Sequence, residues 1–158
     1  MGIEIRVVGT EDLADLLPLM RGYCEFYGMA PSDAALLAMS RRFVEGDGRD
    51  AANGTQLLAR DDDGRAVGHA TILWTWDTTL AEPVAIMEDL FVVAESRGSG
   101  VGRLLLEACR DAAVERGIAQ LDWVTAPDNR TAQRLYDATG ARRSVWVSYR
   151  LPTAKPGP

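Results

Sequence analysis

The sequence predicts an α+β fold, a mixed α/β sheet with helices, and two observations carry this prediction. Segments with strand patterns are interspersed with segments of helical periodicity, in the approximate order β-α-α-β-β-β-α-β-α-β. The 158 residues contain neither a repeat nor a linker, and this length is typical of one domain. We therefore expect a single domain over residues 1–151 and a disordered C-terminal tail at residues 152–158.

The N-terminal third predicts one strand and two helices. Residues 4–9 alternate in polarity, as a strand does. Thr10 can cap the helix that follows, whose apolar side chains recur at helical spacing until Gly28. Ser32 can cap a second helix, and residues 45–54 after it predict a flexible polar loop.

The middle of the chain predicts a β-hairpin followed by a further strand. Asp63-Gly64 is a turn signal, and strand-like segments flank it at residues 55–62 and 66–77. Residues 84–93 form an apolar run that two acidic residues interrupt. Towards the C-terminus the pattern predicts a strand at 119–126, a short helix at 128–140 and a last strand at 142–151.

Composition and charge argue against several classes of function. Acidic residues outnumber basic ones by 23 to 17, which argues against nucleic acid as a partner. Cys24 and Cys109 predict buried thiols rather than a disulfide framework. With the single histidine, His69, they lack the spacing of a zinc site, so no metal is expected. The N-terminus has no signal-peptide pattern and no apolar run is long enough to span a bilayer, so we expect a cytoplasmic protein with no membrane partner.

The stretch from Arg97 to Gly102 has the composition of an anion-binding turn. Gly98, Gly100 and Gly102 come directly before a long amphipathic segment. Backbone N–H groups at such a turn can bind phosphate, and the missing Cβ atoms allow a close approach. Arg97 and Arg103 flank the turn and can add charged hydrogen bonds. Neither the dinucleotide fingerprint nor the P-loop is present, because the residues that complete each motif are missing.

The pattern Arg-x-x-Gly-x-Gly of this stretch resembles the coenzyme A pyrophosphate motif of the GCN5-related N-acetyltransferases. The segment MEDLFVV before it and the pattern N-x-x-A-x-x-x-Y-x-x-x-G-A after it extend the resemblance to the branch of small polyamine and histone acetyltransferases. The resemblance covers nearly the whole chain in element order. It implies an acyl-CoA N-acyltransferase fold, with a central, mostly antiparallel sheet, splayed parallel strands and about four flanking helices. It also implies acetyl-CoA as the cofactor.

In that family the coenzyme lies where two parallel strands splay apart, and here these would be the strands at Leu90–Val93 and Leu121–Thr125. Main-chain groups of the first strand would bind the acetyl carbonyl and the pantetheine arm, and an N–H aimed at the thioester oxygen would stabilise its developing charge. The resemblance implies these cofactor-binding residues: Leu90, Phe91 and Val92 on the strand, Arg97, Gly98, Ser99, Gly100, Val101, Gly102 and Arg103 around the diphosphate, and Asn129, Ala132 and Tyr136 on the later helix.

Two side chains are candidates for proton transfer. Tyr136 matches the family's helix tyrosine, whose phenol can protonate the departing thiolate, although its position also suits a core aromatic. Glu88 matches a carboxylate proposed to take the ammonium proton through water, and a substrate-orienting or salt-bridged carboxylate is the alternative. Because side chains alternate along a strand, Glu88 and Asp89 are expected to face opposite sides of the sheet.

The resemblance implies an acceptor site bordered by the loop between the first two helices and the loop after the second helix. Aromatic faces and carboxylates there would suit a cationic amine, while core filling is the alternative for the aromatic residues. The candidate substrate-binding residues are Tyr23, Glu25, Tyr27, Trp74 and Glu88.

These residues predict an N-acetyltransferase that moves the acetyl group of acetyl-CoA to a primary amine, with a small, polyamine-like molecule as the acceptor. Direct attack in a ternary complex is expected, because no nucleophile–base pair is evident. An enzyme of the same fold acting on a protein lysine or N-terminus, and a non-catalytic acyl-CoA-binding module, are the alternatives. Pairing of two copies through the last strand and the exposed sheet edge would give a homodimer.

Overall fold

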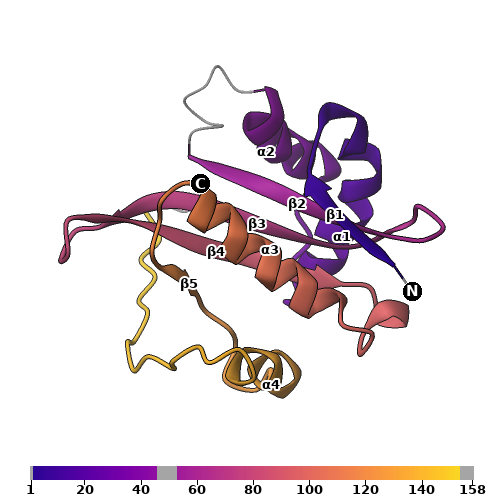
Figure 1. Cartoon of the computed structure of the whole chain (residues 1–158). Coiled ribbons are helices and arrows are strands. Elements are labelled where there is room, and N and C mark those ends of the chain that lie inside the picture. The colour runs from indigo at the N-terminus through magenta and orange to yellow at the C-terminus, as the bar shows by residue number, and fades with distance from the viewer. Residues whose placement is uncertain (1, 46–52, 154–158) are drawn as a thin grey trace. The chain divides into compact units, whose positions relative to one another are not determined.

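The fold is built on a five-stranded sheet with the strand order β1-β2-β3-β4-β5 (Figure 1). Neighbouring strands are antiparallel except for the β4–β5 pair, which is parallel. The predicted mixed, mostly antiparallel sheet is therefore confirmed. The strands are β1 (Ile3–Val7), β2 (Gly54–Asp61), β3 (Ala66–Asp77), β4 (Glu82–Val92) and β5 (Leu121–Trp123).

The computed structural model describes residues 2–45 and 53–153. Contacts divide the chain into two compact units, Met1–Val124 and Thr125–Pro158. Most of the polar loop predicted at 45–54 and of the tail predicted at 152–158 lies outside the described residues.

Three helices of the first unit pack on the sheet: α1 (Leu13–Phe26), α2 (Asp33–Glu45) and α3 (Val101–Glu115). Helices α1 and α2 lie on one face and α3 lies on the other (Figure 1). The α1 face is closely packed, because a Cβ added at Gly22 would come within 2.7 Å of the Phe91 ring. On the α3 face, a Cβ at Gly68 would come within 3.0 Å of Leu105. Within the described residues, no helix is long and apolar enough to cross a membrane.

Local signals explain most of these boundaries. Ser32 caps α2 as predicted, since its Oγ accepts a hydrogen bond from the Ala35 N–H at 3.2 Å. The turn predicted at Asp63-Gly64 joins β2 to β3, and Gly64 has a φ of +77°. The cap predicted at Thr10 is wrong. That residue starts a 3₁₀ turn, Thr10–Asp12, and the Asp12 carboxylate accepts the N–H of Gly9 instead.

The second unit contains helix α4 (Arg130–Asp137). Asn129 caps it, since its side-chain oxygen accepts a hydrogen bond from the Ala132 N–H at 3.2 Å. The strand predicted at 142–151 is wrong, because residues 141–153 have no regular secondary structure. An alternating apolar pattern gives a strand only when a neighbouring strand accepts its backbone groups, and the described part of this unit contains no other strand.

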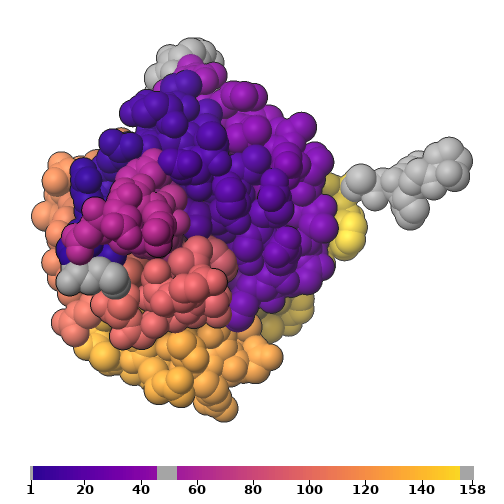
Figure 2. Space-filling model, turned by 90° about the vertical axis from the view of Figure 1, so that its right-hand side faces the viewer, coloured from indigo at the N-terminus to yellow at the C-terminus, as the bar shows by residue number. Residues whose placement is uncertain are grey.

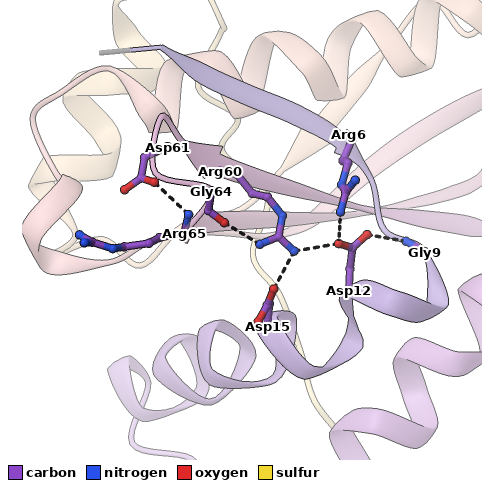
Figure 3. A network of polar contacts seen from close by, with 8 residues as sticks. All are labelled: Arg6, Gly9, Asp12, Asp15, Arg60, Asp61, Gly64 and Arg65. Carbon is purple, nitrogen blue, oxygen red and sulfur yellow. Dashed lines mark hydrogen bonds and ion pairs between the residues drawn. The ribbon is translucent and has the colours of Figure 1, made fainter.

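A charged network joins β1, β2 and the start of α1 (Figure 3). Its centre is Asp12, whose side chain is only 1% exposed. One carboxylate oxygen of Asp12 accepts from Arg6 and, at 2.8 Å, from Arg60, while the other accepts the Gly9 N–H at 3.0 Å. Arg60 also donates to the exposed carboxylate of Asp15 at 2.7 Å. The network holds the first turn of α1 against the edge of the sheet.

Burial alone would raise the pKa of Asp12, but hydrogen bonds from Gly9, Arg60 and Arg6 outweigh it and hold that pKa below its ordinary value of 3.8. The carboxylate therefore stabilises the fold fully above the ordinary pKa, and this contribution is lost as pH falls through the lower, folded-state value.

We expect Asp12→Asn to lower the free energy of unfolding by about 3 kcal/mol at neutral pH, because it leaves two guanidinium groups without their buried partner. Urea denaturation measures this loss. The variant should also lose less stability than the parent between about pH 4 and pH 2. Asp15→Asn is the control. Its carboxylate is 53% exposed, so the cost should stay below about 1 kcal/mol. Equal losses in the two variants would contradict the central role of Asp12.

Candidate active site

An extra residue in β4 shapes the centre of the sheet. Thr71 of β3 pairs with Asp89 and the next residue, Ile72, pairs with Met87, so Glu88 has no partner on β3. This is a β-bulge, which interrupts the alternation of side chains along β4. The phenol of Tyr23 on α1 donates a hydrogen bond to the Glu88 carbonyl at 3.1 Å, which satisfies a group that the bulge removes from the ladder.

A cavity of about 610 Å³ lies between α1, α2 and the sheet, beside the bulge. Helices α1 and α2 cover much of this face of the first unit, in indigo and purple in Figure 2. Glu88 and Asp89 both line the cavity. The expectation that they face opposite sides of the sheet is therefore wrong, because it assumed a strand without a bulge.

Asp89 lies next to His69 on the cavity side of the sheet. The His69 Nε2 atom is 3.5 Å from Asp89 Oδ1, and the histidine side chain is fully buried. Burial lowers the pKa of His69 more than the nearby carboxylate raises it, so the ring is neutral at pH 7. Neither residue is among the site residues predicted from the sequence, because only their diagonal placement across β3 and β4 brings them together.

The structure brings some of the predicted acceptor residues together and separates others. Tyr23 and Glu88 line the cavity, whereas Glu25, Tyr27 and Trp74 do not. Tyr27 is exposed and stacks edge-on against Tyr23, with ring centroids 5.2 Å apart. Trp74 lies on the other face of β3, because residues 69, 71 and 73 face the cavity. The guanidinium of Arg116, at the end of α3, packs over the Trp74 ring, 4.5 Å from the ring centroid.

The parallel ladder of the sheet ends halfway along β4. Its last pair is Met87 with Trp123, whereas β4 continues to Val92 beside β3. The Val93 N–H donates to Val67 of β3, and successive residues of a strand point their N–H and C=O groups to opposite sides. The backbone N–H and C=O groups of Leu90 and Val92 therefore point away from β3. On that side β5 has no residue paired with them within the described chain. This is the splayed arrangement that the sequence predicted.

The glycine loop after β4 leads directly into α3. Gly98 and Gly100 have φ values of +78° and +95°, a region that favours glycine. A Cβ at either position would meet no atom of the chain within 4 Å, so the space outside the loop is open. The first turn of α3 has neither a side-chain cap nor an acidic residue. Its first helical hydrogen bond runs from Leu104 N–H to the Gly100 carbonyl, which leaves earlier N–H groups for an anion.

Side chains around the loop are already fixed by local hydrogen bonds. Arg97 Nε donates to the Val92 carbonyl at 3.0 Å, and Arg103 Nε donates to Glu107 at 2.9 Å. The Ser99 hydroxyl donates to the Ser96 carbonyl at 2.6 Å. Both arginines are exposed, and Arg103 is paired with the Glu107 carboxylate. Donor groups of this kind fit the negatively charged diphosphate of coenzyme A.

The remaining predicted residues lie in the second unit. Asn129 and Ala132 are joined by the capping hydrogen bond at the start of α4. Tyr136 lies near the end of that helix and is partly buried, and its carbonyl accepts the Thr139 hydroxyl at 2.6 Å.

Known proteins are similar to this chain in sequence and in fold. A model of the acetyltransferase (GNAT) family matches residues 18–141. The uncharacterized N-acetyltransferase YhfO of Bacillus subtilis strain 168 is 30% identical over 138 residues, which cover 87% of this chain and 89% of that protein. A crystal structure of a probable acetyltransferase has a TM-score of 0.83 and 25% identity, covering 97% of this chain and 99% of that one. The aminoglycoside N-acetyltransferase AAC(6')-Iy in complex with CoA shares the fold, with a TM-score of 0.83, 22% identity and coverage of 97% and 96%.

The chain therefore belongs to the acetyltransferase (GNAT) family. It is an N-acetyltransferase, and acetyl-CoA is its acetyl donor. The uncapped start of α3, the open glycines and the part of β4 that does not pair with β5 fit this donor.

We expect Gly100→Ala to weaken CoA binding about tenfold, because the added Cβ enters the open side of the loop and strains a left-handed residue. Isothermal calorimetry measures the dissociation constant. Gly117→Ala is the matched control. Gly117 follows the other end of α3, has a φ of +71° and also has no atom within 4 Å of an added Cβ. A similar loss of affinity in both variants would show that strain, and not the loop, is responsible.

Proposed function

We propose that the protein acetylates the primary amine of a small molecule, by direct attack in a ternary complex of enzyme, acetyl-CoA and acceptor. The observation that carries this proposal is the double role of β4. Its residues Glu88 and Asp89 line the cavity, and the next residues present backbone groups that β5 leaves unpaired. One short strand segment therefore serves an acceptor on one side and an acetyl thioester at its edge.

Within this proposal, each group has a defined task. Acetyl-CoA supplies an activated acetyl thioester. The unpaired N–H groups of Leu90 and Val92 would bind the acetyl carbonyl oxygen at the strand edge. They would stabilise the negative charge that develops on this oxygen. A carboxylate oxygen of Glu88 accepts the proton that an ammonium must lose before its nitrogen can attack, with water as the relay. The phenol of Tyr136 supplies a proton to the departing sulfur.

The cysteines support direct attack rather than a covalent acetyl-enzyme. Burial, with a smaller contribution from Asp89, raises the pKa of Cys109 to about 12. Burial also raises the pKa of Cys24, which lines the cavity, and the carboxylates of Asp89 and Glu25 add to this shift. Both thiols are therefore protonated at neutral pH, and a thiol is a much weaker nucleophile than a thiolate.

A small acceptor suits the cavity better than a protein chain does. Its volume of about 610 Å³ falls within the usual range for small-molecule sites. Residues of α1, α2, β3 and β4 line it, whereas a peptide tail would need a long groove.

The proposal is tested by a CoA-release assay with a panel of primary amines and histone peptides. Initial rates measured against both substrates should give intersecting double-reciprocal lines, as a ternary complex requires. Parallel lines, together with acetyl transfer to the enzyme in the absence of amine, would contradict direct attack. CoA binding without acetylation of any amine would support a non-catalytic module instead.

We expect Glu88→Gln to lower kcat/KM by about 10²-fold to 10⁴-fold and to remove the basic-group dependence from the pH–rate profile. Glu25→Gln is the control, since Glu25 is an exposed α1 carboxylate outside the cavity lining. An unchanged pH–rate profile in Glu88→Gln would contradict the role of this carboxylate as the base.

We expect Tyr136→Phe to lower kcat at saturating substrates, since it removes the proton for the leaving thiolate. Steady-state rates measure this loss. Tyr149→Phe is the control, since Tyr149 is 92% exposed. Equal turnover of Tyr136→Phe and the parent would eliminate the proposed acid.

A further inference from the structure

The cavity has one charged end and one apolar end. The charged end is at the bulge, with Glu88, Asp89 and the neutral ring of His69. The apolar end is marked by Phe43 and Leu73, which both lie within 3 Å of a Cβ added at Gly54. Residues 71 and 73 of β3 are two apart, so these ends are roughly 7 Å apart along the strand. Met20, Pro31, Ala35, Leu36 and Met39 complete the apolar wall.

The carboxylates at the charged end have no cation among the residues that line the cavity. Asp89 Oδ1 is buried against the Nε2 atom of His69, 3.5 Å away, and the histidine ring is neutral. The lining contains neither lysine nor arginine. Two carboxylates without a cationic partner in the lining make this end suited to an ammonium group.

The neutral polar groups below the cavity largely bond to one another. Gln56 Nε2 donates to Thr71 Oγ1 at 3.1 Å, and the Ser40 hydroxyl donates to the sulfur of Met20 at 3.1 Å. The titratable groups that face the cavity are Tyr23 and Cys24 from α1, His69 from β3, and Glu88 and Asp89 from β4, while α2 contributes none. A second ammonium placed among Met39, Phe43 and Leu73 would therefore contact apolar side chains and gain no carboxylate partner.

We infer that the acceptor is a monoamine with an apolar body, such as an alkylamine or arylalkylamine, and not a polyamine. This inference rests on the proposed function and specifies its substrate class. The ammonium lies at Asp89 and Glu88, and the hydrocarbon portion extends along Leu36 and Leu73 towards Phe43. It replaces the polyamine-like acceptor that the sequence had suggested.

The test uses two acceptors with the same six-carbon chain, one with a single amine and one with two. In the CoA-release assay with acetyl-CoA and the full chain, kcat/KM for n-hexylamine should exceed that for 1,6-diaminohexane by at least about 30-fold, once the two equivalent amines of the diamine are allowed for. In the series propylamine, butylamine and hexylamine, each methylene should raise kcat/KM about threefold to fourfold. A diamine or polyamine that equals or exceeds hexylamine would overturn the inference.

A variant of the apolar wall tests where the discrimination arises. Met39→Glu places a carboxylate at the apolar end, at a residue that is 41% exposed and so tolerates the change. It should shift the hexylamine-to-diamine ratio by about tenfold in favour of the diamine. Met29→Glu adds the same charge to an exposed methionine outside the lining and should leave the ratio unchanged. Equal shifts in the two variants would show that general electrostatics, and not this wall, selects the acceptor.

The failure of this inference can be told apart from the failure of the proposed function. Acetylation of polyamines but not of monoamines would keep the acetyltransfer to a small amine and overturn the monoamine class. Tight CoA binding by calorimetry without acetylation of any amine would overturn both.

Discussion

The site depends on one constraint, which is that β4 takes part in two ladders of unequal length. On one side it pairs with β3 as far as Val92, and on the other its pairing with β5 ends at Met87. Backbone groups in the last part of β4 are thus held by β3, while their outer edge does not pair with β5. A short β5 of three residues is sufficient for this, because its function is to hold the first half of β4 and to leave the second half free.

The bulge at Glu88 adds the second feature of the site. By placing one more residue in β4 than in β3, it brings two consecutive acidic residues to the same cavity. The Tyr23 hydroxyl holds the bulged carbonyl, so α1 is tied to the strand that carries the acidic residues. The Asp12 network fixes the other end of the same helix to β1 and β2. Helix α1 is therefore anchored at both its first turn and its site-facing half, which preserves the shape of the cavity wall.

Features encoded by local chemistry could be predicted from the sequence. The Asp63-Gly64 turn, the Ser32 cap and the glycine loop before α3 each depend on residues adjacent in the chain, and all three occur in the structure. The bulge could not be predicted, because it is a property of the register between two strands. The same reason explains why Asp89 and His69 were not recognised as neighbours. The strand predicted at 142–151 is wrong because an alternating pattern indicates only a preference for extended backbone. The pattern cannot supply the partner strand that a β-strand needs.

The uncapped start of α3 has a consequence for the stability of the protein as a whole. Ser32 and Asn129 cap α2 and α4, but the N-terminus of α3 has no such side chain. A diphosphate bound at Gly98 and Gly100 would supply the missing acceptors and thereby complete the helix. The melting temperature would then rise with the concentration of acetyl-CoA, because the ligand binds only the folded chain. Folding of the enzyme would in this way be coupled to the supply of its own acetyl donor.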